Sequence, residues 1–400
     1  MHNPVSTSHP SDTASICDKC DGYSEWPYQC ALWVILSGIS NQIPMRVYII
    51  TIHCIHNFGS VFQSYGLVKY LQNEGYDAEL IDYRPDYFRG GRNPLRKYSS
   101  IALNLISYTK QYKHYQSFID KKIIKTSTVY HSIKELQKLA KEDAVFITGG
   151  DQLWNSFHPC GRDDAYKLTF VHKGKKIAYG TSMGRISYSK DELEELSKKI
   201  SDYITIGLRE QSTVSMLQQH TKVPVYHAAD PVLLLNKENY MSFIGEKRLI
   251  NEPYLVMYLA AKSHLLEQTI EHIANRQGLK VVHVCGFSKK CRCDYFLKAT
   301  GPGDLLNLIY YSEFVVSASF HATLFSVLFE KQFCSLLPEA GTNTRIEDFL
   351  SYFGLSGRIV HTVDEIKNLD NQIDFTLTKS IREELVAKSK EQLLSAIVQK

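Results

Sequence analysis

One histidine in the C-terminal half of the chain lies where a helix is predicted to begin. His321 follows a strand predicted at residues 314–317, and Ser319 is placed to cap a helix predicted over residues 320–330. The N-terminus of a helix offers free N–H groups and partial positive charge, which suit a phosphate or a carboxylate. An imidazole there can donate a hydrogen bond to an anion and, when protonated, supply a proton. The alternative is a histidine that only completes the cap region.

An arginine and a glutamate follow another predicted strand. Arg209 and Glu210 come directly after a strand predicted at residues 204–207. A guanidinium can bind a carboxylate or a phosphate through two parallel hydrogen bonds. The alternative for Arg209 is an ion pair with Glu210 or with another helix carboxylate. Glu210 can act as a base toward a sugar hydroxyl or orient Arg209, and both roles stay open.

Polar residues that suit sugar hydroxyls gather after two further strands. Asp151 and Gln152 follow a Gly-Gly turn, which lets the backbone approach a ligand closely. Asp151 can be the base, and the alternative is a turn that its own side chain closes. The first strand–helix junction holds Asn57, Ser60 and Gln63, of which the first two can also cap the helix.

Three further candidate residues have less specific settings. Asn343 and Arg345 begin another predicted helix, where Arg345 adds a second positive contact or forms a surface salt bridge. Asp230 precedes Pro231 near the predicted domain boundary, and we expect it to fix a turn there rather than to touch substrate.

The scaffold for these side chains is an alternation of strands and helices. Short β-branched or aromatic runs end in small or polar loops, and helical stretches follow them. Strands are predicted at residues 47–52, 79–83, 144–148, 176–179, 204–207, 225–227, 254–259, 280–284, 314–317 and 333–336. The pattern predicts an α/β fold of two Rossmann-like, doubly wound domains, whose ligands bind beyond the carboxyl ends of the strands.

The domain limits follow from the same pattern. We expect residues 1–44 to be a disordered leader or an upstream mis-start, because folding information begins at Met45. An N-terminal Rossmann-like domain is predicted over residues 45–236 and a C-terminal one over residues 237–375. Residues 376–400 are predicted to form a helix that packs back on the body, since residues 381–398 carry one apolar stripe.

Composition excludes several classes of protein. The 400 residues include 46 Lys and Arg against 42 Asp and Glu, and a net charge of +4 does not favour a nucleic-acid partner. No apolar run approaches the roughly 20 residues of a membrane-spanning helix. Nine scattered cysteines favour a reducing cytoplasm over a disulfide framework. Cys17-x-x-Cys20 lacks a second ligand pair, so no metal site is predicted. No other cofactor is predicted, because the chain has neither a Walker loop nor a G-x-G-x-x-G fingerprint.

Eight short motifs, in order along the chain, resemble the polysaccharide pyruvyl transferase family. They are residues 56–67 (HNFGSVFQSYGL), 81–85 (IDYRP), 149–155 (GGDQLWN), 178–184 (AYGTSMG), 209–210 (RE), 230–234 (DPVLL), 319–326 (SFHATLFS) and 343–347 (NTRIE). The resemblance covers nearly all of residues 45–360. It implies a GT-B-like arrangement of two Rossmann-type domains around a central cleft.

The resemblance also implies an activity and a set of roles. Pyruvate would pass from phosphoenolpyruvate to a sugar of a capsular or other cell-surface polysaccharide, or of its lipid-linked precursor, as a cyclic ketal. The expected catalytic residues are His321, Arg209, Glu210 and Asp151. The expected donor-binding residues are Ser319, Arg345, Asn343 and Ser182, and the expected acceptor-binding residues are Asn57, Ser60, Gln63 and Gln152.

The chain departs from the family pattern at three positions. Ala322 stands where the family usually has Gly, and Gly150 stands where it usually has Ser. Ser319 stands where some branches carry Arg, so another arginine must hold the donor here if that arginine holds it there.

Other functions and partners remain as alternatives. A GT-B-type glycosyltransferase that uses a nucleotide sugar would have the same architecture, and a non-catalytic glycan-binding paralogue would lack His321 or Arg209. Residues 84–125 hold ten Lys and Arg beside several tyrosines. That segment suits either an anionic lipid-linked glycan at the inner membrane surface or a solvated helical face with its tyrosines turned inward.

Overall fold

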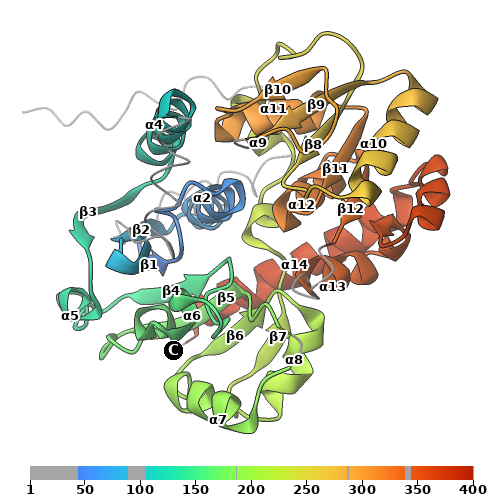
Figure 1. The fold of residues 1–400 in the computed structure, drawn as a ribbon. Helices are drawn as coiled ribbons and strands as arrows, with labels where there is room; N and C mark the ends of the chain where they lie inside the picture. The colour runs from blue at the N-terminus through green and yellow to red at the C-terminus, as the bar shows by residue number, and fades with distance from the viewer. Residues whose placement is uncertain (1–43, 89–104, 186, 286–287, 338–343, 400) are drawn as a thin grey trace, which may run out of the picture. The chain divides into compact units, whose positions relative to one another are not determined.

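The computed structural model describes residues 44–88, 105–185, 187–285, 288–337 and 344–399. Residues Met45–Lys400 belong to one compact unit. The predicted leader lies outside the described residues except for Pro44. Two parallel sheets, each with helices between successive strands, make up the fold (Figure 1). The predicted α/β class is therefore confirmed.

The first sheet contains seven described strands in the order β3-β2-β1-β4-β5-β6-β7. All of its neighbouring strands pair in parallel. The order turns back after β3, so β1 and β4 lie side by side at the centre. The strands are β1 (Arg46–Ile50), β2 (Asp77–Tyr83), β3 (Lys125–Tyr130), β4 (Val145–Gly149), β5 (Lys175–Thr181), β6 (Thr205–Leu208) and β7 (Val225–His227).

The second sheet contains six described strands in the order β10-β9-β8-β11-β12-β13. Its pairs are also parallel throughout. Within each sheet, the carboxyl ends of all strands therefore lie along the same edge. The strands are β8 (Tyr254–Tyr258), β9 (Lys280–Val284), β10 (Tyr295–Leu297), β11 (Phe314–Ser317), β12 (Gln332–Leu336) and β13 (Ile359–Val360).

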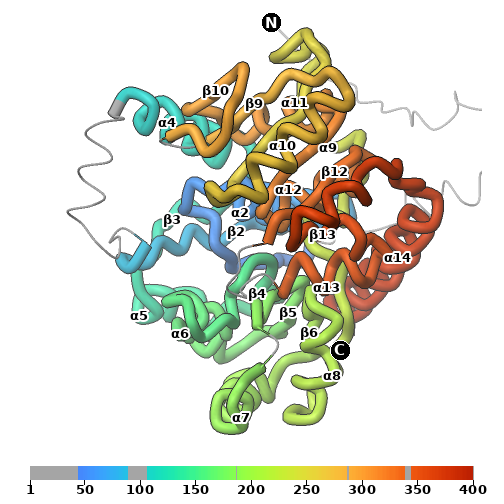
Figure 2. The backbone as a smooth tube through the Cα atoms, turned by 45° about the vertical axis from the view of Figure 1, so that its right-hand side comes forward, coloured from blue at the N-terminus to red at the C-terminus, as the bar shows by residue number. Residues whose placement is uncertain are grey.

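Helices connect these strands and cover the sheet faces (Figures 1 and 2). They are α2 (Phe58–Asn73), α4 (Leu105–Lys122), α5 (Ile133–Leu136), α6 (Pro159–Arg162), α7 (Lys190–Lys199), α8 (Gln211–Gln218), α9 (Glu238–Ile244), α10 (His264–Gln277), α11 (Pro302–Tyr311), α12 (Phe320–Leu328), α13 (Thr344–Tyr352) and α14 (Thr376–Val398).

The predicted strands and the observed ones agree to within two residues at each end. Every predicted strand is present, but β3, β10 and β13 are not predicted. All three lie at the edge of a sheet, where strands are short or expose much of their length and so lack a long apolar run. The strand predicted at residues 176–179 ends two residues too early, because β5 continues to Thr181 through a register irregularity. Gly180 has φ +61° there, a value that glycine adopts without strain.

The basic segment predicted over residues 84–125 is described only in part. Tyr83 and Tyr115 are buried, as expected for tyrosines turned inward, whereas Tyr112 on α4 is 45% exposed. Lys110 and Lys113 on the same helix are also exposed.

A single apolar core joins the two sheets. It contains side chains from β1 and α2 in the first half of the chain and from β8, α11 and α12 in the second half. Two further cores lie on the opposite faces of the sheets, one under α7 and α8 and one under α10. Because the shared core is continuous, the halves are packed against each other and not merely linked.

Aromatic rings form the centre of the shared core. Phe325 of α12 has its ring centroid 5.3 Å from Phe58, 5.4 Å from Phe62 and 5.3 Å from Tyr240. Phe58 and Phe62 belong to α2, so these contacts hold α2 against α12. Such aromatic contacts bury large areas and favour edge-to-face geometry.

The last helix returns to the first sheet. The backbone N–H of Ala229 donates to Ser389 Oγ at 2.9 Å, and Lys175 Nζ donates to the Ile397 carbonyl at 2.8 Å. Leu385 and Leu393 of α14 are buried in the shared core. Helix α14 thus packs on the residues that follow β7 and on the start of β5.

We expect Phe325→Ala to lower the free energy of unfolding by about 3–5 kcal/mol, because it leaves a cavity between α2 and α12. Phe325→Leu should cost less. Chemical denaturation followed by tryptophan fluorescence and by circular dichroism measures both changes. Leu377→Ala on α14 is the control, since Leu377 is 66% exposed and should change stability little. A cost for Phe325→Ala as small as that of the control would contradict the shared core.

Candidate active site

Most of the predicted site residues lie just beyond the carboxyl ends of parallel strands. Ser60 follows β1, Asp151 follows β4, Arg209 follows β6 and His321 follows β11. Arg345 comes from α13 instead. This is the edge at which open parallel sheets bind ligands.

The carboxylate of Asp230 is the centre of the cluster. Arg209 Nη1 donates to Asp230 Oδ2 at 2.7 Å, and His321 Nε2 lies 3.4 Å from the same oxygen. The other oxygen, Oδ1, accepts from the Val232 N–H at 2.9 Å and caps the 3-10 helix after β7. Asp230 therefore fixes the turn, as expected, and also contacts two predicted catalytic residues, which was not expected.

The surroundings of Asp230 keep it ionised. Burial opposes the charge, yet His321, Arg209 and the Val232 N–H lower the pKa of Asp230 well below its ordinary value. Only 2% of the residue is exposed. A buried negative charge thus stands between an arginine and a histidine.

Two arginines in the cluster keep hydrogen-bond donors unused. Arg209 is buried, and its Nε and Nη2 have no hydrogen-bond partner among the described residues. The nearest carboxylate oxygen to Arg209 Nε is Glu210 Oε1 at 3.6 Å, beyond hydrogen-bond distance. Arg345 Nε is likewise buried without an acceptor in the described part of the chain. Buried donors are seldom left in this state, so the cluster suits an anionic ligand.

The ring of Phe320 lies against both guanidinium groups. Arg209 Cζ is 4.4 Å and Arg345 Cζ is 5.7 Å from the ring centroid. Cation–π contact stabilises the two cations without using their N–H donors. Phe320 therefore holds the arginines close together while leaving the donors free for a ligand.

Burial and neighbouring charges shift the pKa values of both arginines. Desolvation and the charge of Arg209 lower the pKa of Arg345 to about 10. Burial also opposes the charge of Arg209, but Asp230, Glu210 and Asp151 raise its pKa. Both groups stay cationic at neutral pH, and an anion between them would relieve their repulsion.

His321 lies against the start of another helix. A Cβ atom on Gly59 would lie 1.9 Å from His321 Nδ1, so the ring occupies the space that a side chain at position 59 would fill. Gly59 is in the first turn of α2, and His321 is in the first turn of α12. The N-termini of two helices thus meet at this imidazole. Their partial positive charges add to those of the arginines.

Asp151 faces the same positive groups. Ser60 Oγ donates to its Oδ2 at 2.7 Å, and the Gln152 N–H donates to its Oδ1 at 2.8 Å. Desolvation raises the pKa of Asp151, but the charges of Arg345, Arg209 and His321 lower it by more. The net shift of the pKa is therefore downward. The residue is partly exposed, in contrast to Asp230.

Glu210 is held by groups of the neighbouring strand. Ser182 Oγ donates to Glu210 Oε1 at 2.6 Å, and the Met183 N–H donates to Oε2 at 3.1 Å. Glu210 and Ser182 are both buried. The arrangement favours the positioning role of Glu210 over the role of a base.

The other predicted site residues lie around this cluster. Asn57 caps α2 by accepting from the Ser60 N–H at 3.2 Å, and Ser319 caps α12 by accepting from the Ala322 N–H at 3.4 Å, so these two predicted caps are confirmed. The prediction that Ser60 also caps α2 is wrong, because Ser60 lies in the first turn of that helix. Gln152 Oε1 accepts from Asn155 Nδ2 at 2.7 Å. Asn343 lies outside the described residues.

Gln63 is placed deeper than a ligand-binding residue needs to be. It is fully buried, and its Nε2 donates to Thr51 Oγ1 at 2.8 Å. A Cβ atom on Gly150 would lie 1.5 Å from Gln63 Oε1. The Gly-Gly turn before Asp151 thus allows close approach to this side chain.

Helix α13 is fastened beside the arginines by a carboxylate. Asp348 Oδ2 accepts from the Gln211 N–H at 2.7 Å, and its Oδ1 accepts from the Ser212 N–H at 3.0 Å. These amides open α8, directly after Arg209 and Glu210. A negative side chain is stabilising at such a helix N-terminus. Asp348 thereby brings Arg345, one turn earlier on α13, to the carboxyl end of β6.

Sequence reasoning missed Phe320, Asp348 and the ionic role of Asp230. Phe320 stands directly before His321, but an aromatic residue at a helix start gives no signal for a cation contact. Asp348 acts on amides 137 and 136 positions away along the chain, which no local pattern reveals.

Comparison with known families identifies the chain. The model of the family described as polysaccharide pyruvyl transferase matches residues 57–338, which is well over half of the sequence. The chain belongs to the polysaccharide pyruvyl transferase family. Comparison with curated protein sequences finds no match.

Solved structures share the fold of this family member. A protein provisionally assigned as a UDP-N-acetylglucosamine 2-epimerase from Listeria monocytogenes aligns with a TM-score of 0.50 and 11% identity, over 89% of this chain and 96% of its own. MnaA of S. aureus, solved with UDP, aligns with a TM-score of 0.50 and 11% identity, over 89% of this chain and 98% of its own. At this identity the likeness concerns the fold alone, and it is GT-B-like.

The described part of this pyruvyl transferase family member was compared with two patterns, a membrane-spanning helix and a cluster of metal ligands. None of the described helices is both long and apolar enough to cross a membrane. Within the same segments, no group of three or more His, Cys, Asp or Glu side chains is arranged to hold a metal ion.

We expect Asp230→Asn to lower the free energy of unfolding by about 3 kcal/mol at neutral pH, because it leaves Arg209 without its buried counter-charge. The pKa of Asp230 is lower in the folded protein than its ordinary 3.8. The stabilisation by the carboxylate is therefore complete above that value and is lost progressively as the pH falls below it. Urea denaturation of both proteins from pH 7 to pH 3 should show the difference shrinking toward acid.

The matched control for this measurement is an exposed ion pair. Asp143 is 79% exposed and lies 3.1 Å from Lys173 Nζ, so Asp143→Asn should cost no more than a few tenths of a kcal/mol. An Asp230→Asn protein as stable as this control at pH 7 would show that the buried pair does not support the fold.

Proposed function

We propose that this member of the family transfers pyruvate from phosphoenolpyruvate to a glycan sugar as a cyclic ketal. The observation that carries the proposal is the set of buried guanidinium donors without acceptors on Arg209 and Arg345. Phosphoenolpyruvate bears a carboxylate and a phosphate on the same carbon atom. Two arginines held side by side against one aromatic ring suit two anionic groups at that spacing.

The position of Arg345 supports the donor assignment in a second way. Ser319 stands where some branches of the family carry an arginine, and it caps α12 instead. Arg345 comes from α13 and contacts the Phe320 ring next to that cap. It supplies the second cation from another element, while Ser319 and Ser182 contribute as a cap and as a support for Glu210.

The reaction then needs one acid and one base. A proton added to the methylene carbon of phosphoenolpyruvate leaves a positive centre at the next carbon, which one sugar hydroxyl attacks. A second hydroxyl of the same sugar displaces phosphate and closes the ketal. Of the two hydroxyl protons, one balances the proton given to the methylene carbon, and the other leaves with phosphate. His321 supplies the acid, with Asp230 opposite its Nε2 to stabilise the imidazolium.

Asp151 is the base in this proposal. Glu210 is buried and has both carboxylate oxygens engaged, whereas Asp151 is partly exposed. The nearby cations depress the pKa of Asp151 in the free protein. A donor anion bound between Arg209 and Arg345 would offset those charges and make Asp151 more basic at the moment it is needed.

The acceptor would approach from the side of the first strand–helix junction. Asn57 is exposed, and Ser60 and Gln152 contact or flank Asp151. These groups can bind sugar hydroxyls around the base. If the acceptor is lipid-linked, exposed Lys110 and Lys113 on α4 give a face for anionic headgroups.

The first experiment combines donor binding with turnover. Saturating phosphoenolpyruvate should raise the melting temperature of the protein, since a ligand at 100 times its Kd stabilises by about 2.7 kcal/mol. Arg345→Met should abolish this shift, and Arg276→Met on α10 should retain it, because Arg276 is a 58% exposed surface residue.

The turnover test uses another variant. His321→Ala should keep its fold and lose phosphate release and ketal formation, with the ketal measured by mass spectrometry of the glycan. Stabilisation only by a nucleotide sugar, or wild-type turnover by His321→Ala, would overturn the proposal.

A second variant tests how α13 is positioned. Asp348→Asn weakens the contact with the start of α8 and should let Arg345 move away from Arg209. We expect the KM for phosphoenolpyruvate to rise several-fold with a smaller change in kcat, because the reacting groups themselves stay. Asp191→Asn, in the exposed first turn of α7, is the matched control and should leave both constants unchanged. A fall in kcat with unchanged KM would contradict a positioning role for Asp348.

A further inference from the structure

A second cavity lies at the carboxyl edge of the C-terminal sheet, outside the cluster around Asp230. Its volume is about 510 Å³. Loops after β8 and β9 form one wall, and α4 of the first half forms the other. Helix α4 lies beside β10 and α11 in both views (Figures 1 and 2). The lining residues that matter are Tyr108, Gln111, His283, Cys285, Lys290 and Lys298.

The charges on this wall are of one sign. Lys290 and Lys298 line the cavity, and none of the described residues that line it is acidic. Burial raises the pKa of Cys285 to about 11, so its thiol is neutral at pH 7. The lining therefore carries two positive charges and no negative one, which favours an anionic ligand.

A buried histidine adds a polar group without a partner. His283 is 2% exposed, it lines the cavity, and its Nδ1 has no hydrogen-bond partner in the described part of the chain. The ring lies against Phe296, with centroids 4.8 Å apart. Burial and the charges of Lys290 and Lys289 lower the pKa of His283 to about 4. A neutral imidazole that lacks a partner beside two lysines suits a ligand oxygen.

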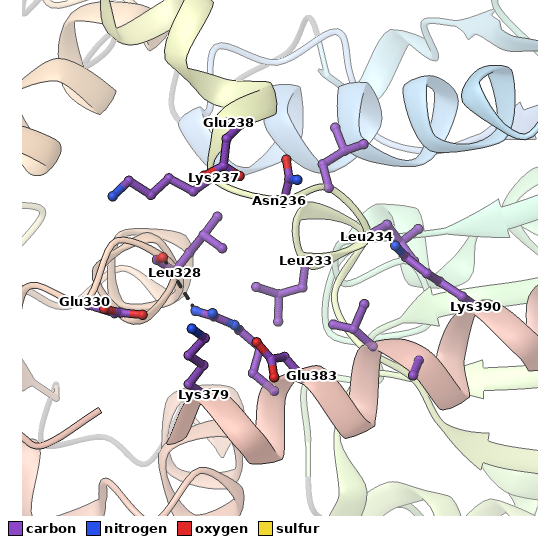
Figure 3. Close-up of a pocket in the computed structure, with 14 residues that line it drawn as sticks. Leu233, Leu234, Asn236, Lys237, Glu238, Leu328, Glu330, Lys379, Glu383 and Lys390 are labelled. Atoms are coloured by element: carbon purple, nitrogen blue, oxygen red, sulfur yellow. Dashed lines mark hydrogen bonds between the residues drawn. The ribbon is translucent and has the colours of Figure 1, made fainter. Parts of the chain in front are cut away.

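Another cavity of the molecule shows what a mixed lining looks like. A cavity of about 580 Å³ lies between α14, the end of α12 and the segment after Leu233 (Figure 3). Four cations line it, and three carboxylates lie among them: Lys237, Lys379, Arg382 and Lys390 with Glu238, Glu330 and Glu383. Its charges nearly balance, so its preference for an anion is weaker than that of the basic cavity, and it serves as an internal comparison.

The basic cavity continues toward the candidate active site. Tyr108 and Gln111 of α4 also line a neighbouring cavity of about 590 Å³ that reaches His56. His56 directly precedes Asn57, the cap of α2, and Gly59 of that helix touches His321. A ligand can thus extend along α4 from the basic cavity to the loop where the acceptor sugar is expected.

We propose that the cavity lined by His283, Lys290 and Lys298 binds a diphosphate group, the one that joins the glycan acceptor to its carrier. The inference rests on the proposed function, because that function supplies the glycan acceptor. The choice of His283, Lys290 and Lys298 rests on the cavity itself. Two lysines and an imidazole match the oxygens of two linked phosphates better than those of one. The carrier is a nucleoside or a lipid, and both present the same diphosphate.

Isothermal titration with inorganic pyrophosphate tests the site directly. We expect the double variant Lys290→Ala/Lys298→Ala to bind at least about tenfold more weakly than wild type, because it loses two charge-assisted contacts. His283→Phe keeps an aromatic ring against Phe296 but removes the imidazole nitrogens. It should therefore also weaken pyrophosphate binding. The control Lys379→Ala/Lys390→Ala removes the same charge from the mixed cavity and should bind as wild type. Melting temperatures without ligand confirm that all variants are folded.

Competition identifies the source of the diphosphate. Uridine diphosphate and farnesyl diphosphate are titrated against bound pyrophosphate, and tighter binding of either supports the site and names its carrier. Absence of pyrophosphate binding by wild type, or equal binding by Lys290→Ala/Lys298→Ala, would overturn the proposal. So would displacement by phosphoenolpyruvate, since the cavity would then be the donor site. Ketal formation from phosphoenolpyruvate is measured in parallel, so that loss of one proposal leaves the other standing.

Discussion

The carboxylate of Asp230 lies where three segments of the chain converge, and the candidate site depends on its charge. It accepts from Arg209 after β6, faces His321 at the start of α12, and caps the 3-10 helix after β7. Taking an arginine, a histidine and an aspartate out of water is costly unless each finds a partner. Arg209 donates only from Nη1 to Asp230, and its Nε and Nη2 have no hydrogen-bond partner among the described residues. The interaction that stabilises the cluster thus leaves part of the guanidinium group unsatisfied.

This arrangement requires the two halves of the chain to meet closely. Rings from α2 and α12 pack in one apolar core, and the N-termini of the two helices meet where the imidazole of His321 lies over Gly59. A small residue at position 59 is a condition for the contact, because any side chain there would collide with the ring. Phe320 then keeps Arg209 and Arg345 together from the other side. Hydrophobic packing between the halves therefore sets the distances among the charged groups.

The sequence predicts the central strands and the residues at their ends, because buried parallel strands read as short β-branched or aromatic runs. The bounds of two such strands are recovered without error, Lys280–Val284 and Phe314–Ser317. Those of the edge strand Val225–His227 are also recovered. The edge strands β3, β10 and β13 escape because one of their sides needs no apolar partner. Site residues are found when a polar side chain follows a strand, as for Arg209 and Asp151. Asp348 and Phe320 are not found, since their importance comes from contacts between elements that lie far apart in the chain.

The return of α14 to the first sheet links the end of the chain to this chemistry. Ser389 accepts from the N–H of Ala229, the residue directly before Asp230, although the two lie 160 positions apart. The tail therefore acts as a brace for the backbone that presents the central carboxylate. A deletion that removes Ile397 takes away the contact of Lys175 at the start of β5, and one that reaches Ser389 also takes away the hydrogen bond that holds the backbone next to Asp230.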